Sequence, residues 1–511
     1  MLPSAVRLGE RQGAYIMLNR IHRRDFLGLA AAGAAVLPRA TPAWAQAAGT
    51  IAVQQTAGTK RFAEESALKW QPAGGSSAGA IVLDPTRTYQ EMLGFGAALT
   101  DASAYMINQL DAAAREKFLR ELYDPSELGM AVTRVCIGAS DYATKLYSYD
   151  EGDPDPDLQR FSIDHDKQYI LPQLRIARQH NPSLYLLASP WSPPGWMKAN
   201  GTMLGGSMKP RNFPVYAKYL VKFLQSYQAE GVPVDAITPQ NETDTDQDGR
   251  MPACVWAQEH EIAFVSQHLG PALGQSKIPT KIWILDHNFN LWGRVINTLE
   301  NPDVYRYVDG VAWHPYVGSV TAMTRVHDMF PDKHMYWTEG RLGATADPAG
   351  VLSYAGTPAA VNPDGSPRPR RDLPSTAMIA QAGVGAANAV RNWVRCIMFW
   401  NVVLDELGNP NIGPMHSVPL IVIDSKTKEI IRGGDYWAMK HYNHAARRGA
   451  RRFDTQGELG GVAHVAFVNP DGTKTLVLSN VGAERKAQLR LGRLMTEVSL
   501  PASSITNLSW M

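Results

Sequence analysis

The chain has 511 residues, of which 45% are apolar and 19% are charged, and its formal net charge at pH 7 is +2. This length and apolar share suffice for one large folded domain and a smaller one. A net charge so near zero gives no general attraction to phosphate backbones, so a nucleic-acid partner is not expected. The cysteines are Cys136, Cys254 and Cys396, and with no C-x-x-C spacing they indicate neither a zinc site nor a disulfide framework.

Residues 1–45 have the pattern of a cleavable export signal. The pair Arg23-Arg24 precedes an apolar, alanine-rich stretch at 29–37, and Ala43-Trp44-Ala45 fits a small-residue cleavage site. The apolar stretch is too short to span a bilayer, which argues against a membrane helix. The paired arginines resemble the twin-arginine signal of bacteria. We therefore expect cleavage after Ala45 and a soluble mature protein, without a transmembrane segment, in the periplasm or the medium.

Strand and helix patterns alternate over residues 91–446, which predicts a parallel sheet with helical crossovers. Eight strand–helix units over roughly 350 residues are the size of a (β/α)8 TIM barrel with insertions. The expected strands are 92–99, 130–138, 183–191, 235–242, 281–288, 309–316, 334–339 and 396–404. The clearest helical patterns are 111–123, 167–180, 213–227, 256–269, 377–394 and 435–446.

Shorter strand patterns lie on both sides of the barrel segment. Residues 46–90 have strand-like runs at 51–54 and 80–83, and residues 447–511 have runs at 462–468, 474–478 and 487–491. Residues 469–472 (Asn-Pro-Asp-Gly) join two of these runs and are a strong hairpin signal. We expect the N-terminal and C-terminal strands to form one side β-sandwich, so the predicted fold class is α/β with a side β-domain. The proline- and arginine-rich stretch 357–373 predicts a long loop over the barrel mouth.

Two glutamates, Glu242 and Glu339, end two of the predicted barrel strands. Side chains at the carboxyl ends of barrel strands point into the mouth, where TIM-barrel active sites lie. Two carboxyl groups that face each other are what cleavage of a glycosidic bond requires. Either glutamate alone would fit an ordinary pair with arginine or lysine, so the surrounding motifs decide between the two interpretations.

Six short motifs follow one another in the order of a known family. They are Gly94–Asp101, Ser189–Lys198, Gly205–Pro210, Gln240–Glu242, Trp337–Gly340 and Phe399–Asn401. Together they resemble glycoside hydrolase family 30, whose founding activity is glucosylceramidase. The resemblance covers nearly all of the chain after the signal, and the shared order makes it specific although each motif alone is weak. It implies a TIM barrel with a side β-domain, net retention of configuration, and no metal or organic cofactor.

The resemblance implies that Glu242 is the general acid/base and Glu339 the nucleophile. Glu242 must be protonated to give a proton to the leaving oxygen, so its pKa is expected to be raised. Glu339 must be ionised to attack the anomeric carbon, and in a retaining site the two carboxyl groups stand ~5–5.5 Å apart. Asn241 matches the family residue that bonds the sugar 2-hydroxyl, a contact that strengthens in the transition state.

Three further residues match family positions that hold the sugar in the first subsite: Asp101, Trp191 and Trp400. A carboxylate can accept two hydroxyl bonds, and an indole can donate one or cover a ring face. For Trp400, which lies within an apolar strand, core packing is a serious alternative.

Three more residues match the family around the nucleophile. Arg134 would keep Glu339 ionised, although a structural salt bridge is equally consistent. His314 and Tyr316 match the family pattern after the sixth strand. Tyr316 is expected to bond Glu339, whereas His314 could simply be a hydrogen-bonded core histidine.

Other patterns are weaker. The G-x-S-x-G pattern at 75–79 precedes a strand instead of linking strand to helix, so it is interpreted as a loop. Asp244, Asp246 and Asp248 open like a calcium loop, but the twelfth position is Val255 and the bidentate glutamate is missing. The basic run 447–452 predicts a solvated junction between domains, and contact with anionic lipid is the alternative.

The leaving-group side departs from the family more than the sugar side does. Thr243 stands where the family commonly has proline, and 414–417 departs from the glucosylceramidase pattern. We expect a carbohydrate or glycolipid substrate: a β-D-glucoside such as glucosylceramide or an aryl or alkyl glucoside. Endo-β-1,6-glucanase and β-xylosidase activities remain open within this fold. The alternatives from other classes are a carbohydrate-binding protein without catalysis and a lipid-surface protein that uses the basic run.

Overall fold

The computed structural model describes residues 49–74, 79–342, 345–346, 352–353 and 374–511. The predicted signal, residues 1–45, and the predicted loop 357–373 lie outside the described residues, as does most of the 75–79 pattern. Within the described ranges, no helix has the length and apolar character needed to cross a bilayer. Cys136, Cys254 and Cys396 are buried free thiols.

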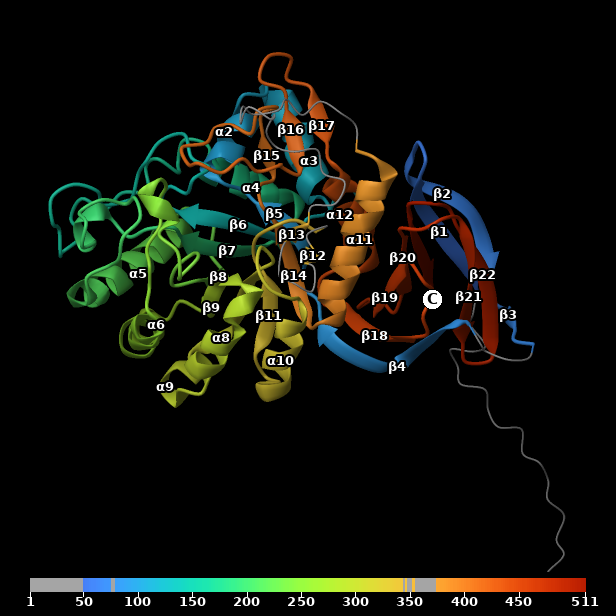
Figure 1. Ribbon diagram of the computed structural model, residues 1–511. Coiled ribbons are helices and arrows are strands. Elements are labelled where there is room, and N and C mark those ends of the chain that lie inside the picture. Colours follow the sequence, from blue (N-terminus) through green and yellow to red (C-terminus); the bar gives the residue numbers. More distant parts are fainter. Residues whose placement is uncertain (1–48, 75–78, 343–344, 347–351, 354–373) are drawn as a thin grey trace, which may run out of the picture. The chain divides into compact units, whose positions relative to one another are not determined.

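Eight parallel strands close into a barrel, which confirms the predicted TIM-barrel fold (Figure 1). All of the predicted barrel strands belong to it, and their side chains are nearly all buried because helices cover the outside of the barrel. In order around the barrel the strands are β5 (Gly94–Ala98), β6 (Val132–Ile137), β7 (Tyr185–Pro190), β8 (Ala236–Ile237), β9 (Lys281–Asn288), β10 (Val308–His314), β11 (His334–Trp337) and β14 (Val394–Phe399).

Helices follow the barrel strands with caps and apolar faces that the sequence dictates. The predicted helices correspond to α3 (Ala112–Tyr123), α4 (Ile170–His180), α5 (Phe213–Ala229), α6 (Gln258–Phe264) with a π-helical turn at Val265–Leu269, α11 (Thr376–Arg391) and α12 (Gly434–Ala445). The Asp111 side chain caps α3 by accepting from the Ala114 N–H. Sequence patterns missed helices whose periodicity is short: α2 (Asp101–Asn108), α7 (Gly270–Ser276), α8 (Trp292–Leu299), α9 (Pro302–Tyr305) and α10 (Thr321–Met329).

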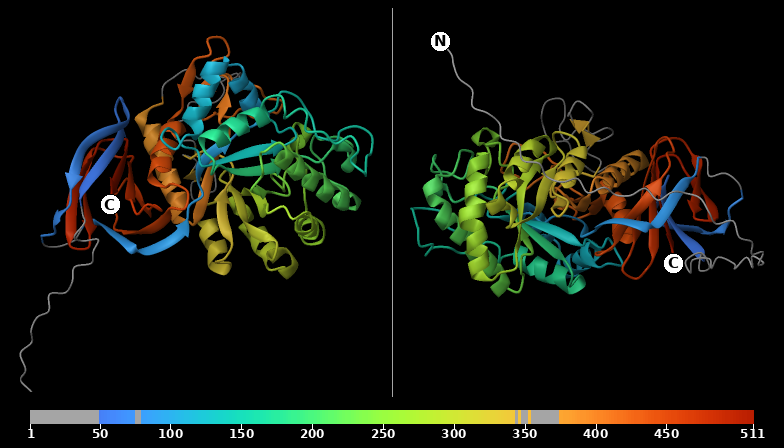
Figure 2. Two further views of the ribbon diagram at one scale, coloured as in Figure 1. Left: turned by 180° about the vertical axis from the view of Figure 1, so that it is seen from behind. Right: turned by 90° about the horizontal axis from the view of Figure 1, so that it is seen from below.

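A ten-stranded sheet outside the barrel joins the two ends of the described chain, which confirms the side β-domain. Figure 2 shows its N-terminal strands in blue beside the C-terminal strands in red. The predicted hairpin is present, with β19 antiparallel to β20 and Gly472 at φ +84° in the turn. The strands are β1 (Thr50–Ala57), β2 (Lys60–Lys69), β3 (Gln71–Pro72), β4 (Ile81–Glu91), β18 (Arg451–Gln456), β19 (Val462–Val468), β20 (Lys474–Asn480), β21 (Arg485–Leu491), β22 (Leu494–Leu500) and β23 (Ser504–Trp510).

Helices α11 and α12 connect this sheet to the barrel by packing on β19, β20 and β23. His441 of α12 is fully buried at this contact. Its Nε2 lies 2.8 Å from the Thr56 hydroxyl, and its Nδ1 lies 2.9 Å from Asn507 Oδ1. The two side chains that bond His441 thus come from β1 and β23, at opposite ends of the described chain.

Two small sheets complete the fold. The strands β15 (Val403–Leu404), β16 (Ile421–Ile423) and β17 (Ile430–Arg432) form one, and residues 405–420 run between its first two strands. The strands β12 (Thr345–Ala346) and β13 (Leu352–Ser353) form the other, after Glu339.

Candidate active site

Glu242 reaches the barrel mouth from a short irregular segment, not from the strand end that the sequence predicts. Strand β8 ends at Ile237. Beyond it the chain makes isolated backbone hydrogen bonds to the neighbouring strands: the Asn241 N–H donates to the Pro190 carbonyl, and the Glu242 N–H donates to the Asp286 carbonyl. Glu242 has φ +51°, a left-handed conformation that costs a non-glycine residue of order 1–3 kcal/mol. Such strain persists only where surrounding contacts fix the backbone, as they do here.

Glu339 follows β11 by two residues and is held by donors on both carboxylate oxygens. Arg134 Nη1 donates to Oε2 at 2.8 Å, and the Tyr316 hydroxyl donates to Oε1 at 2.8 Å. The expected bond from Tyr316 to Glu339 is therefore confirmed, and Arg134 lies beside the predicted nucleophile as expected.

Arg134 is fully buried and connects the nucleophile to the rest of the site. Its Nη2 donates to Asn241 Oδ1 at 2.8 Å and to Asp286 Oδ2 at 2.7 Å. Burial opposes ionisation of Asp286, but Arg134 and then His314 outweigh it and hold the pKa of Asp286 far below its ordinary value. Asp286, which the sequence analysis did not single out, thus anchors the guanidinium.

His314 lies between the two glutamates and is more than a core histidine. Its Nδ1 is 3.5 Å from Glu242 Oε1, and its Nε2 is 3.9 Å from Glu339 Oε2 and 3.0 Å from Asp286 Oδ1. Burial lowers the pKa of His314, but the negative charge of Glu339 and the bonds to Asp286 and Glu242 raise it to about 9. Both predicted catalytic carboxyl groups therefore flank one imidazole ring.

The expected raised pKa of Glu242 is wrong for this arrangement. Burial does raise it, but the hydrogen bond from His314, the charges of His287 and His314 and the bond from Gln247 lower the pKa to about 2. The sequence argument considered burial alone, whereas the structure places two imidazoles against the carboxyl group. In the free site, the proton between Glu242 and His314 therefore lies on the imidazole.

The two glutamates open into a cleft of about 600 Å³. Trp191 and Trp400 line it and stack on each other, with ring centroids 5.0 Å apart and planes 19° apart. Trp400 is only 5% exposed, so it packs in the core, as the alternative interpretation proposed. It also forms part of the cleft wall. Arg134 lies behind both rings, 4.7 Å from the Trp191 centroid.

Asp101, which the sequence predicts to hold the sugar, is buried and lies outside the lining of the cleft. Its Oδ1 accepts from the Tyr169 hydroxyl and contacts His165 Nε2, while its Oδ2 accepts from the backbone and hydroxyl of Thr144. These partners occupy both oxygens. Asp101 therefore fixes the loop after β6 from behind.

The carboxyl group that faces the cleft from this loop is Asp141, which the sequence analysis missed. It is 4% exposed, lines the cleft, and its Oδ1 has no protein partner. Burial, followed by the charges of Glu339 and Glu242, raises the pKa of Asp141 well above its ordinary value. Asp101 and Asp141 both follow barrel strands, so their positions in the sequence fit a site residue equally well. The packing shows that Asp141 is the one that lines the cleft.

Polar residues that precede β9 or lie at its end also line the cleft. His287 Nε2 lies 2.5 Å from Asp244 Oδ1, and Gln247 Nε2 donates to Glu242 Oε2 at 2.8 Å. Asp248 instead pairs with Arg250, so the acids of the calcium-like pattern point to different partners.

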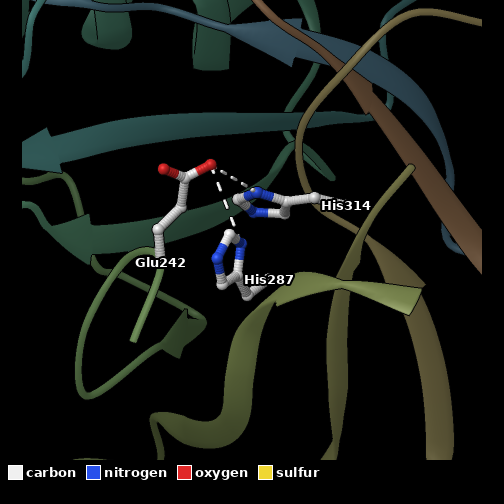
Figure 3. Close-up of side chains that lie close together, drawn as sticks. All are labelled: Glu242, His287 and His314. Carbon is white, nitrogen blue, oxygen red and sulfur yellow. Dashed lines mark ion pairs between the residues drawn. The ribbon is translucent and has the colours of Figure 1, made fainter. Parts of the chain in front are cut away.

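The side chains of Glu242, His287 and His314 offer ligand atoms that lie within 4.8 Å of one another (Figure 3). The figure shows both rings turned toward the same carboxyl oxygen, the ion pairs being drawn as dashed lines. Within the parts of the chain that the structure describes, this is the cluster with the donors to hold a metal ion.

An eight-stranded barrel whose mouth holds two glutamates in a tryptophan-walled cleft is the architecture of a glycoside hydrolase. Comparison with known families agrees. The glycosyl hydrolase family 30 TIM-barrel domain matches residues 92–354, and the beta sandwich domain of the same family matches residues 449–508. The chain therefore belongs to glycosyl hydrolase family 30.

Proteins similar to this chain include glucosylceramidases and endo-β-1,6-glucanases. A putative glucosylceramidase 4 of Caenorhabditis elegans is 30% identical over 423 residues, which is 78% of this chain and 76% of that protein. An endo-1,6-beta-D-glucanase of Neurospora crassa is 29% identical, covering 80% and 82% of the two chains. The solved structure of the endo-beta1,6-glucanase BT3312 has a TM-score of 0.77 and 27% identity, over 90% of this chain and 99% of that chain.

Proposed function

We propose that this protein hydrolyses β-glycosidic bonds with retention of configuration and that a β-D-glucoside is its substrate. The observation that carries the proposal is the contact of Glu242 and Glu339 with the same buried imidazole at one end of a cleft. Both carboxyl groups that glycosidic bond cleavage requires thus share one cleft. The family resemblance, which implies net retention, favours double displacement, in which one carboxylate attacks the sugar directly.

The cleft offers partners for one sugar ring. Trp191 and Trp400 provide aromatic surface, and Asp141 provides an acceptor that no protein donor occupies at Oδ1. A sugar hydroxyl can supply the missing hydrogen bond of this buried group. Asn241 is oriented by Arg134, which binds its Oδ1, and so its amide nitrogen remains the donor for a 2-hydroxyl.

In the proposed reaction Glu339 attacks the anomeric carbon while Glu242 protonates the departing oxygen. Arg134 and Tyr316 hold the attacking carboxylate. His314 supplies the proton, because its Nδ1 is 3.5 Å from Glu242 Oε1 and its pKa is raised to about 9. Once the sugar ester forms, Glu242 takes a proton from water, and the hydroxide breaks the ester and releases the sugar with its original configuration.

Two leaving groups fit different features. Similarity to glucosylceramidases favours a glycolipid, as in glucosylceramide. Similarity to endo-1,6-beta-glucanases and the polar lining at Asp244, Gln247, Asn288 and Asn290 favour a second sugar, as in a β-1,6-glucan. A β-xyloside is a further candidate that the fold admits.

A substrate panel tests the proposal. Release of 4-nitrophenol from the aryl β-glucoside is expected to exceed release from the β-xyloside, and Glu339→Gln is expected to abolish it. Turnover of glucosylceramide against β-1,6-linked oligosaccharides then assigns the leaving group. Sugar binding without turnover of any of these substrates would instead support a carbohydrate-binding protein.

We further propose that the chain is exported through its N-terminal segment. The support is the pair Arg23-Arg24, the apolar stretch and the Ala43-Trp44-Ala45 site. Replacing both arginines with lysine is expected to leave the protein in the cytoplasm with its signal uncleaved. Unchanged export of this variant would contradict the proposal.

A further inference from the structure

Two histidines present the same ring atom to one oxygen of Glu242. His314 Nδ1 lies 3.5 Å and His287 Nδ1 lies 3.8 Å from Glu242 Oε1. Both rings are at least nine-tenths buried, and neither Nδ1 has another hydrogen-bond partner. We propose that Glu242, His287 and His314 form a binding site for a divalent transition-metal ion such as Zn²⁺, and that the bound ion blocks Glu242.

The other nitrogen of each ring is already held by a carboxylate. His287 Nε2 is 2.5 Å from Asp244 Oδ1, and His314 Nε2 is 3.0 Å from Asp286 Oδ1. Metal-binding histidines usually donate their second N–H to a carboxylate, which fixes the ring and leaves the first nitrogen as the ligand. This pattern occurs twice around one carboxyl oxygen, so both rings are oriented for an ion.

The spacing of the ligand atoms is close to that of a metal site. Metal–ligand distances of about 2.0–2.2 Å in a tetrahedral site place two ligand atoms roughly 3.3 Å apart. The two separations from Glu242 Oε1, 3.5 and 3.8 Å, exceed that value by a few tenths of an ångström. All three ligand atoms lie within 4.8 Å of one another, so a small rotation of the side chains closes the gap.

Charge around the cluster favours a cation. The groups that face it are the carboxyl groups of Glu339, Asp141, Asp244 and Asp286 and the guanidinium of Arg134. The fixed positive charge of Arg134 already pairs with Glu339 and Asp286.

The donor set selects the class of ion. Two imidazole nitrogens and one carboxylate suit Zn²⁺, Cu²⁺ or Ni²⁺, whereas Mg²⁺ and Ca²⁺ prefer oxygen ligands alone. A bound ion occupies Oε1 of Glu242, so the inhibition rests on the proposed function, while the binding does not.

The binding test uses the full chain without a histidine tag, titrated with Zn²⁺ at pH 7.5 by calorimetry, with X-ray absorption of the complex. One ion per chain with two nitrogen ligands is expected. His287→Asn and Glu242→Gln should each weaken binding at least tenfold. The control is His180→Asn, because His180 pairs with Glu116 on the barrel exterior, and it should bind like wild type. Equal affinity in wild type and His287→Asn would overturn the proposal.

The inhibition test measures aryl β-glucoside hydrolysis against Zn²⁺, each variant being referred to its own metal-free rate. We expect Zn²⁺ to inhibit the wild type and EDTA to reverse the inhibition. In His287→Asn, the same inhibition is expected to need at least tenfold more Zn²⁺. Zn²⁺ binding through nitrogen ligands without any glycoside turnover would contradict the proposed function and leave the site standing. Turnover that Zn²⁺ does not affect would overturn the inhibitory site alone.

Discussion

Asp141 and Asp101 are two buried carboxyl groups with opposite roles in this structure. Asp141 lines the cleft with an unpartnered oxygen, whereas Asp101 is saturated by Thr144, His165 and Tyr169. Asp141→Asn is therefore expected to lower kcat/KM for an aryl β-glucoside by about 5–150-fold, since leaving a buried hydrogen-bond partner unsatisfied costs about 1–3 kcal/mol. Steady-state kinetics measures this effect.

Asp101→Asn is the matched control for Asp141→Asn. It removes a structural acceptor, so thermal unfolding should shift to lower temperature, while the kinetic loss should be smaller than for Asp141→Asn. If Asp101→Asn loses more kcat/KM than Asp141→Asn in folded protein, the assignment of the sugar-facing carboxyl group is wrong.

Arg134 joins two buried carboxylates, so its loss leaves both unpaired. Arg134→Met is expected to destabilise the protein by about 3–5 kcal/mol, the cost of breaking a buried ion pair from one side. Urea unfolding measures it. A variant as stable as wild type would mean that Asp286 and Glu339 need no guanidinium.

Motifs at the residue scale predicted Glu242, Glu339, Arg134 and Tyr316 because each follows or lies on a barrel strand. Asp141 and His287 could not be chosen in the same way. Asp141 lies in a loop, whose sequence does not encode side-chain direction by periodicity. His287 lies in β9 directly after Leu285 and Asp286, whose left-handed backbone (φ +74° and +50°) breaks the alternation of a regular strand. The prediction of a raised pKa for Glu242 failed for a related reason, since this pKa is set by imidazole rings from two other strands.

At the scale of elements, alternation and apolar runs were enough to identify every barrel strand. Strand β8 shows the limit of that approach. Its run of buried residues continues to Asn241, but strand pairing stops at Ile237. Beyond it the chain makes only isolated hydrogen bonds to neighbouring strands before Glu242 adopts a left-handed backbone. A pattern of buried residues predicts burial, and it does not predict where a ladder of hydrogen bonds ends.

Gly383 of helix α11 lies close against the side sheet. A Cβ added there would lie 2.3 Å from Ser479 Oγ and 2.7 Å from Ile505 Cδ1. Gly383→Ala is therefore expected to destabilise the protein by about 1–3 kcal/mol through overpacking, as measured by urea unfolding.

Gly274 in helix α7 is the matched control, because a Cβ there would meet nothing within 4 Å. Gly274→Ala should stabilise the protein by up to about 1 kcal/mol through helix propensity. Stabilisation by both substitutions would show that α11 and the sheet are not in close contact.

At the scale of the whole molecule, the barrel and the side sheet are joined by the buried ring of His441. Burial lowers the pKa of His441 to about 3, whereas in the unfolded chain it is ordinary. Between about pH 6 and 3 the unfolded state therefore binds one more proton at this site. The free energy of unfolding should fall by up to about 1.4 kcal/mol for each pH unit lowered in this window.

Carboxyl groups also titrate in that window, so the slope must be compared with that of His441→Asn. The variant is expected to be less stable at pH 7 and to lose less stability per pH unit below 6. Identical slopes for the two proteins would contradict a neutral buried His441.

The central claim is that Glu339 attacks the sugar while Glu242 protonates the leaving group, both from one cleft. Proton NMR of the sugar released in the first minutes of aryl β-glucoside hydrolysis tests it most directly, before mutarotation mixes the anomers. The account predicts that the β-anomer appears first, because two displacements restore the configuration. Initial release of the α-anomer would mean a single displacement by water, and Glu339 could not then be the nucleophile.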